Sequence, residues 1–146
     1  MLRRRDDERG SVLMLMPAAV LIVIVLASIA VDFGVVFLGE REVADLAAAA
    51  ANDAVTAGVD VDRLREDGSY VLDPALVEHI VDAALADSST AVDLDEPVVE
   101  VTTVGGQPAV RVTLRGTIGY VFARALPGGP DTATVDASAV AVAEPG

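Results

Sequence analysis

Few side chains in this sequence could take part in covalent chemistry. The 146 residues include a single histidine and no cysteine, which excludes a thiol nucleophile and a multi-histidine metal site. His79 falls on the polar side of an expected amphipathic helix, where we expect it to be solvated. No serine or carboxylate has a spacing that would make His79 a catalytic base. We therefore expect a protein that is not an enzyme and has no cofactor.

The acidic side chains are more numerous, but their spacing does not match a metal site. Asp60 and Asp62 have the spacing of the first two ligands in a calcium loop. Leu64 and Arg65, however, stand where a further ligand and the turn glycine belong. The acids within residues 93–96 fit a solvated loop better than a catalytic pair. We expect no bound metal.

Charge is distributed unevenly along the chain. Ten arginines and no lysine stand against 23 acids, a net charge of −13. An acidic chain without a basic stripe is a poor partner for the phosphates of a nucleic acid, so nucleic-acid binding is not expected. Residues 1–10 hold four arginines and three acids, whereas residues 39–146 hold six arginines and nineteen acids. The two ends of the chain are therefore suited to different environments.

Residues 11–31 separate these two parts and contain no charged side chain. Twenty-one helical residues reach roughly 31 Å, enough to cross a hydrocarbon core of about 30 Å. This predicts a single-pass membrane protein with the lipid bilayer as a partner. The arginine-bearing leader, residues 1–10, should be cytoplasmic and the acidic part extracytoplasmic. The alternative is a secretory signal cleaved after Ala30, but the run exceeds the usual apolar region and helix formers continue beyond it.

Helix-forming residues extend past the apolar run, so residues 11–57 are expected to form a transmembrane helix and a helical stem. Pro17 should kink the helix without ending it. One narrow stripe of this helix carries small side chains at spacings of 7, 4, 3, 4 and 3: Val36, Val43, Ala47, Ala50, Ala54 and Ala57. The stripe packs either on the chain's own outer domain or on other subunits, and its spacing is compatible with both.

Three features occur together in the first third of the chain. Glu8-Arg9-Gly10-Ser11 precedes the apolar run, Val31-Asp32-Phe33-Gly34 ends it, and an alanine-rich helix follows. This region resembles TadE/TadG-like proteins of the tight-adherence (Tad, Flp-type) pilus assembly machinery of bacteria. The resemblance implies a membrane-anchored, non-catalytic component of a pilus assembly or secretion machine. It would contact other Tad membrane subunits through its N-terminal helix, as a homo- or hetero-oligomer. The absence of lysine beside many alanines suits a GC-rich genome such as that of an actinobacterium.

In pilin-like members of that machinery, a peptidase cuts after a glycine and the fifth mature residue is glutamate. Here Gly10 and Ser11 form the candidate processing site, and the fifth residue would be Leu15. Leucine lacks the buried carboxylate that needs a partner amine in a filament. A stationary membrane subunit is therefore expected rather than a major filament subunit.

The charged residue at the end of the apolar run has two interpretations. Asp32 falls at the outer end of the span, where we expect it to lie among lipid headgroups and keep its water. Recognition of a partner is the alternative. Gly34 and Gly39 are expected to be positions of close helix packing rather than hinges.

An acidic connector, residues 58–73, should lead into a small α+β domain, residues 74–146. Asp73-Pro74 is a typical helix start, and the apolar spacing predicts a helix over 74–86. Alternation then predicts strands at 98–104, 109–118 and 132–143, the first two joined by Gly105-Gly106. We expect a three- or four-stranded antiparallel meander on a pilin-like plan, covered by that helix and the stem. The apolar cluster Tyr120, Val121, Phe122 and Leu126 belongs either to the core or to an exposed patch for a partner or the membrane surface.

Overall fold

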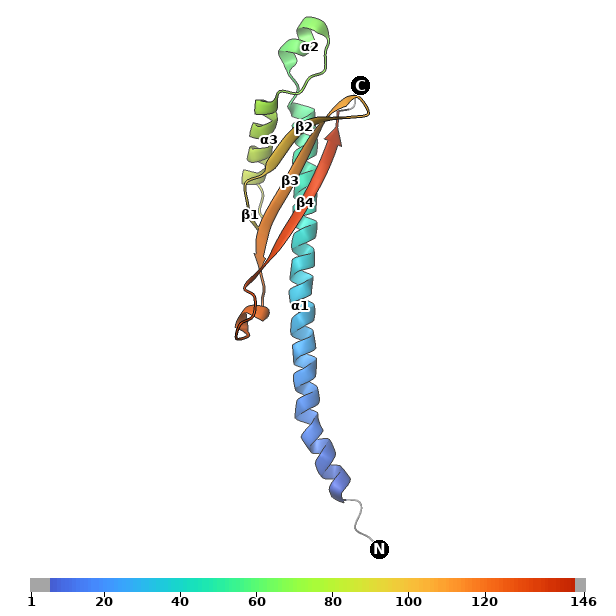
Figure 1. Cartoon of the computed structure of the whole chain (residues 1–146), viewed down its shortest axis with the longest axis vertical. Helices are drawn as coiled ribbons and strands as arrows, with labels where there is room; N and C mark the ends of the chain where they lie inside the picture. Colours follow the sequence, from blue (N-terminus) through green and yellow to red (C-terminus); the bar gives the residue numbers. More distant parts are fainter. Residues whose placement is uncertain (1–5, 144–146) are drawn as a thin grey trace.

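The structure is a computed structural model that describes residues 6–143, with side chains described for 15–66 and 68–143. Residues 1–5 of the predicted leader lie outside this range. One helix, α1 (Asp6–Ala57), runs from the N-terminal end of the molecule to the far end of the outer domain (Figure 1). Pro17 lies inside α1 and does not terminate it. The predicted span and stem are therefore one continuous rod.

The segment predicted as a connector contains a short helix, α2 (Val61–Asp67). The side chain of Asp60 accepts hydrogen bonds from the backbone N–H groups of Asp62 and Arg63, which caps the first turn. Gly68 ends the helix in the left-handed conformation, with φ of 75°. The carboxylate that resembled a calcium ligand thus acts as a helix cap.

The helix α3 (Pro74–Ala86) has the bounds that its sequence predicts. Asp73 accepts hydrogen bonds from the N–H groups of Ala75 and Leu76, and proline at the first helical position lacks an N–H that would otherwise need a partner. Val77 and Val81 are fully buried, whereas His79 is exposed on the opposite side. Spacing along the chain was sufficient to orient this helix.

Four antiparallel strands form one sheet: β1 (Asp93–Leu94), β2 (Val98–Val104), β3 (Gln107–Gly119) and β4 (Thr132–Val142). The central strand β3 pairs with β4 along one edge and with β2 and then β1 along the other. Gly105 and Gly106 join β2 to β3 with φ of 59° and 84°, the positive values that a tight hairpin turn requires. The loop predicted around residues 93–96 therefore contains a short strand.

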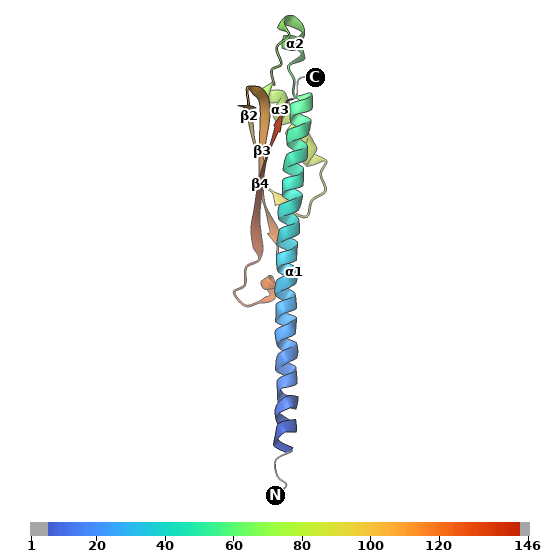
Figure 2. The same cartoon turned by 90° about the vertical axis from the view of Figure 1, so that its right-hand side faces the viewer.

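One face of the sheet and one face of α1 form the core. Alternate residues of β3, among them Val110, Val112 and Leu114, are fully buried, while Arg111 and Arg115 face solvent. The sheet packs along the distal half of α1, and α3 packs beside both, so that the N-terminal half of α1 extends alone (Figures 1 and 2). The fold is α+β, as predicted.

Candidate functional site

The projecting part of α1 is apolar on all sides. From Leu15 to Val31 its large side chains are exposed, although Ile29, near the end of this stretch, also lines a cleft with residues of the outer domain. The Ser28 hydroxyl donates a hydrogen bond of 2.8 Å to the carbonyl of Ile24, so this polar group is satisfied within the helix. Among the described residues this is one helix long and apolar enough to cross a membrane.

Asp32 stands directly after this segment and is bound by the outer domain. Its Oδ1 accepts hydrogen bonds from the N–H groups of Val121 at 2.7 Å and Phe122 at 3.0 Å. Its Oδ2 accepts one from the N–H of Ala123 at 2.7 Å. Asp32 is only 7% exposed. The expectation that this carboxylate keeps its water is therefore wrong: backbone N–H groups of the chain itself take the place of solvent.

The segment that binds Asp32 is the loop between β3 and β4, residues 120–131. It contains a 3₁₀ turn, η1 (Ala123–Ala125), whose N-cap residue Phe122 provides no side-chain cap. The first N–H groups of a helical turn have no partner within the turn, and a carboxylate is well suited to accept their hydrogen bonds. Asp32, about 90 residues earlier, supplies that cap. The loop and the helix are thereby fixed to each other.

A small cleft of about 190 Å³ lies between the loop and α1. It is lined by side chains of both segments: Ile29, Asp32, Phe33, Tyr120, Ala123 and Pro130. Ile29 belongs to the uncharged run, about one helical turn before Asp32. The loop therefore extends alongside the last helical turn of the apolar segment.

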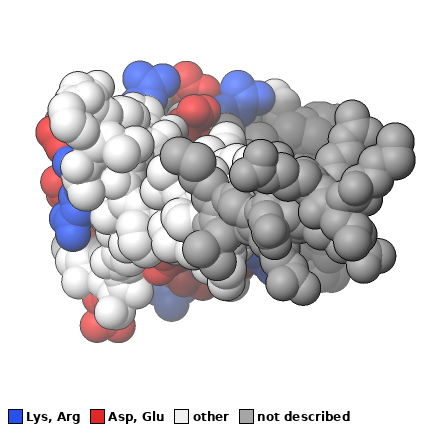
Figure 3. Space-filling model, turned by 90° about the horizontal axis from the view of Figure 1, so that it is seen from below, with Lys and Arg blue, Asp and Glu red and all other residues white. Residues whose placement is uncertain are grey.

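The loop also carries exposed apolar side chains. Phe122 is 45% exposed and Leu126 is 65% exposed, and Val121 is exposed as well. Of the two interpretations of this cluster, the structure excludes a core role for these three residues; Tyr120 is half-buried. Viewed from the N-terminal end of α1, the described surface is largely uncharged, with charged side chains near its margin (Figure 3).

The stripe of small residues packs inside the chain. Its central members are fully buried in the core: Val43, Ala47, Ala50 and Ala54. Val36 is partly buried and Ala57 is exposed. Of the two interpretations left open by the sequence, packing on the outer domain is the one observed, because small side chains let the sheet and α3 approach the stem closely.

The other motif residues have different surroundings. Val31 is exposed. A Cβ added to Gly39 would lie 2.9 Å from Cδ1 of Ile118, so close packing is confirmed there. A Cβ added to Gly34 would meet no atom within 4 Å, so close packing within the chain is wrong for this glycine. Gly10 and Ser11 lie in α1, and their side chains are outside the described set.

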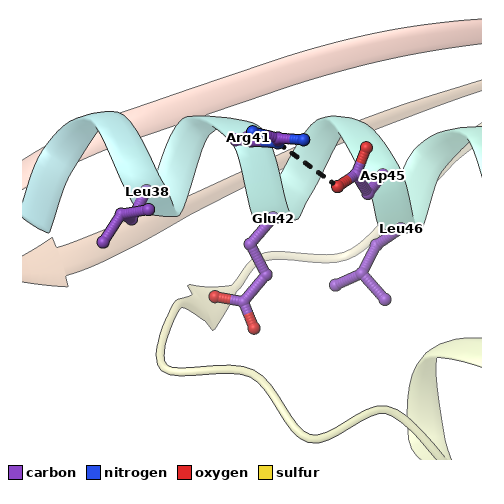
Figure 4. A pocket seen from close by; sticks show the side chains of 5 residues that line it. All are labelled: Leu38, Arg41, Glu42, Asp45 and Leu46. Atoms are coloured by element: carbon purple, nitrogen blue, oxygen red, sulfur yellow. Dashed lines mark ion pairs between the residues drawn. The ribbon is translucent and has the colours of Figure 1, made fainter.

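A second hollow lies on the surface of the stem and is lined by residues of α1 alone. Glu42 and Leu46 point toward the side on which the segment before β1 lies, Leu38 lies one helical turn before Glu42, and Arg41 pairs with Asp45 at 3.9 Å (Figure 4). Both members of the pair are largely exposed, so water screens their attraction. This groove offers an apolar wall and solvated charges without a nucleophile beside a base. Among residues 15–66 and 68–143, no three histidine, aspartate or glutamate side chains are placed to hold a metal ion.

The sequence interpretation missed the partner of Asp32. A carboxylate at the end of an apolar helix needs hydrogen-bond donors if water is excluded, and this requirement could have prompted a search for them. The longest acid-free segment of the outer part, residues 101–130, contains the loop that supplies the donors. Every residue except proline has a backbone N–H group, however, so the residue types do not show which N–H groups bind Asp32.

Comparisons with known proteins add no relative. No protein-family model matches the chain, and neither the curated proteins nor the solved structures include a match.

Proposed function

We propose that this protein is a single-pass membrane anchor and structural subunit of a bacterial envelope machine of the Tad/Flp pilus assembly or secretion type. The main support for the proposal is the exposed apolar N-terminal half of α1. The helix continues from there without a break into the core of the outer domain. An uncovered apolar helix of this length needs lipid around it. Because α1 is continuous, the sheet that packs on its distal half lies at a fixed distance from the bilayer.

The direction of insertion follows from charge. The arginine-bearing leader favours the cytoplasmic side, and the strongly acidic outer part favours the extracytoplasmic side. The assignment to a Tad-type machine rests on the resemblance of residues 8–57, in which the motif Val31-Asp32-Phe33-Gly34 follows the span.

Contacts with other membrane subunits would involve the surface of α1 that the outer domain leaves free. The alanine stripe is occupied, but Phe33, Gly34 and Phe37 are exposed next to the span. Gly34 allows a second helix to approach closely because it has no side chain. We therefore assign partner contacts to this surface rather than to the stripe.

Deletion of the gene, followed by imaging of surface filaments and measurement of secretion, tests the assignment to the machine. Loss of filaments that a plasmid copy restores is expected, and normal filaments with normal secretion would contradict it. The mass of the mature protein tests the anchor separately. An N-terminus at Met1 or Leu2 supports a permanent anchor, one at Ser11 indicates a pilin-like route, and one at Val31 indicates a secreted binding module.

A further inference from the structure

We propose that the loop 120–131 is a membrane-contacting foot that sits in the outer interface of the bilayer, with Val121, Phe122 and Leu126 against lipid. The inference rests on the proposed function insofar as α1 must span the bilayer. It adds a second contact with lipid, made by a segment of the outer domain some 90 residues from the span. Asp32 then has the role of holding that segment at the correct depth.

The bonds to Asp32 set the depth of the loop relative to the span. The three hydrogen bonds from Val121, Phe122 and Ala123 hold the loop at the level of Asp32, the first residue after the uncharged run. The cleft beneath the loop includes Ile29, which lies about 4.5 Å further along the helix toward the bilayer centre. The headgroup layer extends roughly 5–7 Å beyond each side of the hydrocarbon core. If residues 11–31 fill the core, the loop must lie within this layer.

The loop exposes apolar side chains that the rest of the described chain leaves uncovered. Phe122 and Leu126 are large, apolar and largely uncovered. Phe33 of α1, which lines the cleft together with Tyr120 and Ala123 of the loop, is exposed as well, so both segments present apolar side chains next to the span. Tyr120, half-buried at the base of the loop, is of the residue type that favours the boundary between lipid and water.

The backbone of the loop forms most of its hydrogen bonds within the chain. A segment that leaves water needs partners for its N–H groups. Within residues 120–130, Pro127 and Pro130 have no N–H, and hydrogen bonds to the chain satisfy those of Tyr120, Val121, Phe122, Ala123, Ala125, Leu126 and Gly129. Asp32 accepts three of these bonds. Seven of the nine backbone N–H groups in residues 120–130 thus have acceptors within the chain, which lowers the free-energy cost of moving the loop out of water.

The charge of the loop differs from that of the rest of the outer part. The protein carries a net charge of −13, which anionic headgroups would repel. Residues 101–130, however, contain no acid and three arginines, of which the exposed Arg124 lies in η1. Arg124 can reach lipid phosphates while its neighbours contact acyl chains. The loop is therefore suited to an anionic lipid surface.

The test uses the absence of tryptophan from the chain. Phe122→Trp and Leu126→Trp are made separately in the full chain. Each protein is reconstituted in vesicles of phosphatidylcholine and phosphatidylglycerol, with or without lipids brominated near the top of the acyl chain. Val104→Trp is the matched aqueous control, because Val104 is also 45% exposed but lies at the hairpin turn, at the opposite end of β3. Leu26→Trp, in the uncharged run, is the lipid control.

Both loop tryptophans are expected to emit at shorter wavelength than Val104→Trp and to lose fluorescence in brominated lipid, whereas iodide should quench only Val104→Trp. Quenching of Leu26→Trp together with aqueous behaviour of both loop variants would overturn the inference and leave the anchor intact. Aqueous behaviour of Leu26→Trp would contradict the anchor itself.

Trypsin provides a measurement that needs no substitution. In vesicles with the outer domain outward, cleavage after Arg124 is expected to be slowed relative to cleavage after Arg63 in α2, at the opposite end of the outer domain. Detergent should remove this difference only in part, because Asp32 still holds the loop. Equal cleavage at both sites in vesicles would count against the foot.

Discussion

Asp32 and Ala123 stand 91 positions apart in the chain, and the N–H of Ala123 donates a hydrogen bond of 2.7 Å to Oδ2 of Asp32. The other carboxylate oxygen accepts the N–H groups of Val121 and Phe122. These bonds connect the end of the apolar run in α1 to the loop that joins the end of β3 to the start of β4. Asp32 thus fixes the loop between β3 and β4 to α1, while the buried residues of the stem hold the sheet and α3.

Removal of the Asp32 carboxylate should release the loop. Asp32→Ala removes both acceptor oxygens and with them all three hydrogen bonds, whereas Asp32→Asn retains one oxygen and places an amide nitrogen toward a backbone donor. We expect the rate of tryptic cleavage after Arg124 to rise strongly for alanine and less for asparagine, with faster amide exchange at residues 121–123. Asp45→Ala is the control, because Asp45 lies on the same helix and forms only an exposed ion pair. An unchanged cleavage rate in Asp32→Ala would contradict the role of Asp32 as the cap of η1.

The alanine stripe should tolerate no increase in volume. Ala47 is fully buried against the core, so Ala47→Leu forces the sheet away from the helix and should lower the free energy of unfolding by about 1–3 kcal/mol. Its neighbour Ala48 is exposed, and Ala48→Leu should change stability by less than about 0.5 kcal/mol. Urea unfolding of both variants in the same detergent measures the difference. Equal stabilities would mean that the stem does not pack on its own sheet.

Two glycines of α1 should respond differently to alanine. Gly34→Ala adds a methyl group in open space and removes a poor helix former, so the fold should be unaffected or slightly stabilised. Gly39→Ala introduces a contact with the end of the Ile118 side chain, which must move, and should reduce the melting temperature relative to Gly34→Ala. If a partner helix packs on Gly34, the folded Gly34→Ala variant should still fail to restore filaments in the deletion strain. Normal filaments with this variant would remove Gly34 from the proposed contact surface.

The cap of α3 should contribute to the stability of the outer domain. Asp73→Ala leaves the N–H groups of Ala75 and Leu76 without their acceptor and should cost about 1 kcal/mol. Asp73→Asn, which keeps an acceptor oxygen at the same place, should recover most of this loss. Thermal unfolding followed by circular dichroism makes the comparison. Identical melting temperatures for all three proteins would show that the cap is not limiting for stability.

Elements whose signals are local could be predicted. Asp73-Pro74 and the spacing of Val77 and Val81 predict α3 with its observed bounds, and Gly105-Gly106 between alternating segments predicts the β2–β3 hairpin. The short helix α2 was not expected, because its acids suggested a connector and its cap, Asp60, resembled an ion ligand. The short strand β1 was missed as well, since two residues are too few to display a period.

The sequence by itself determined the apolar run, the helical stem and the alternation of the sheet, because each is a repeat over neighbouring residues with the period of its backbone. Only the tertiary structure decided which surface covers the alanine stripe, that Phe122 and Leu126 face outward, and that the Asp32 carboxylate is capped by a distant loop. These relationships join segments far apart in the chain, and Asp32 binds backbone N–H groups that nearly every residue possesses. The pattern of residue types therefore does not predict these long-range contacts.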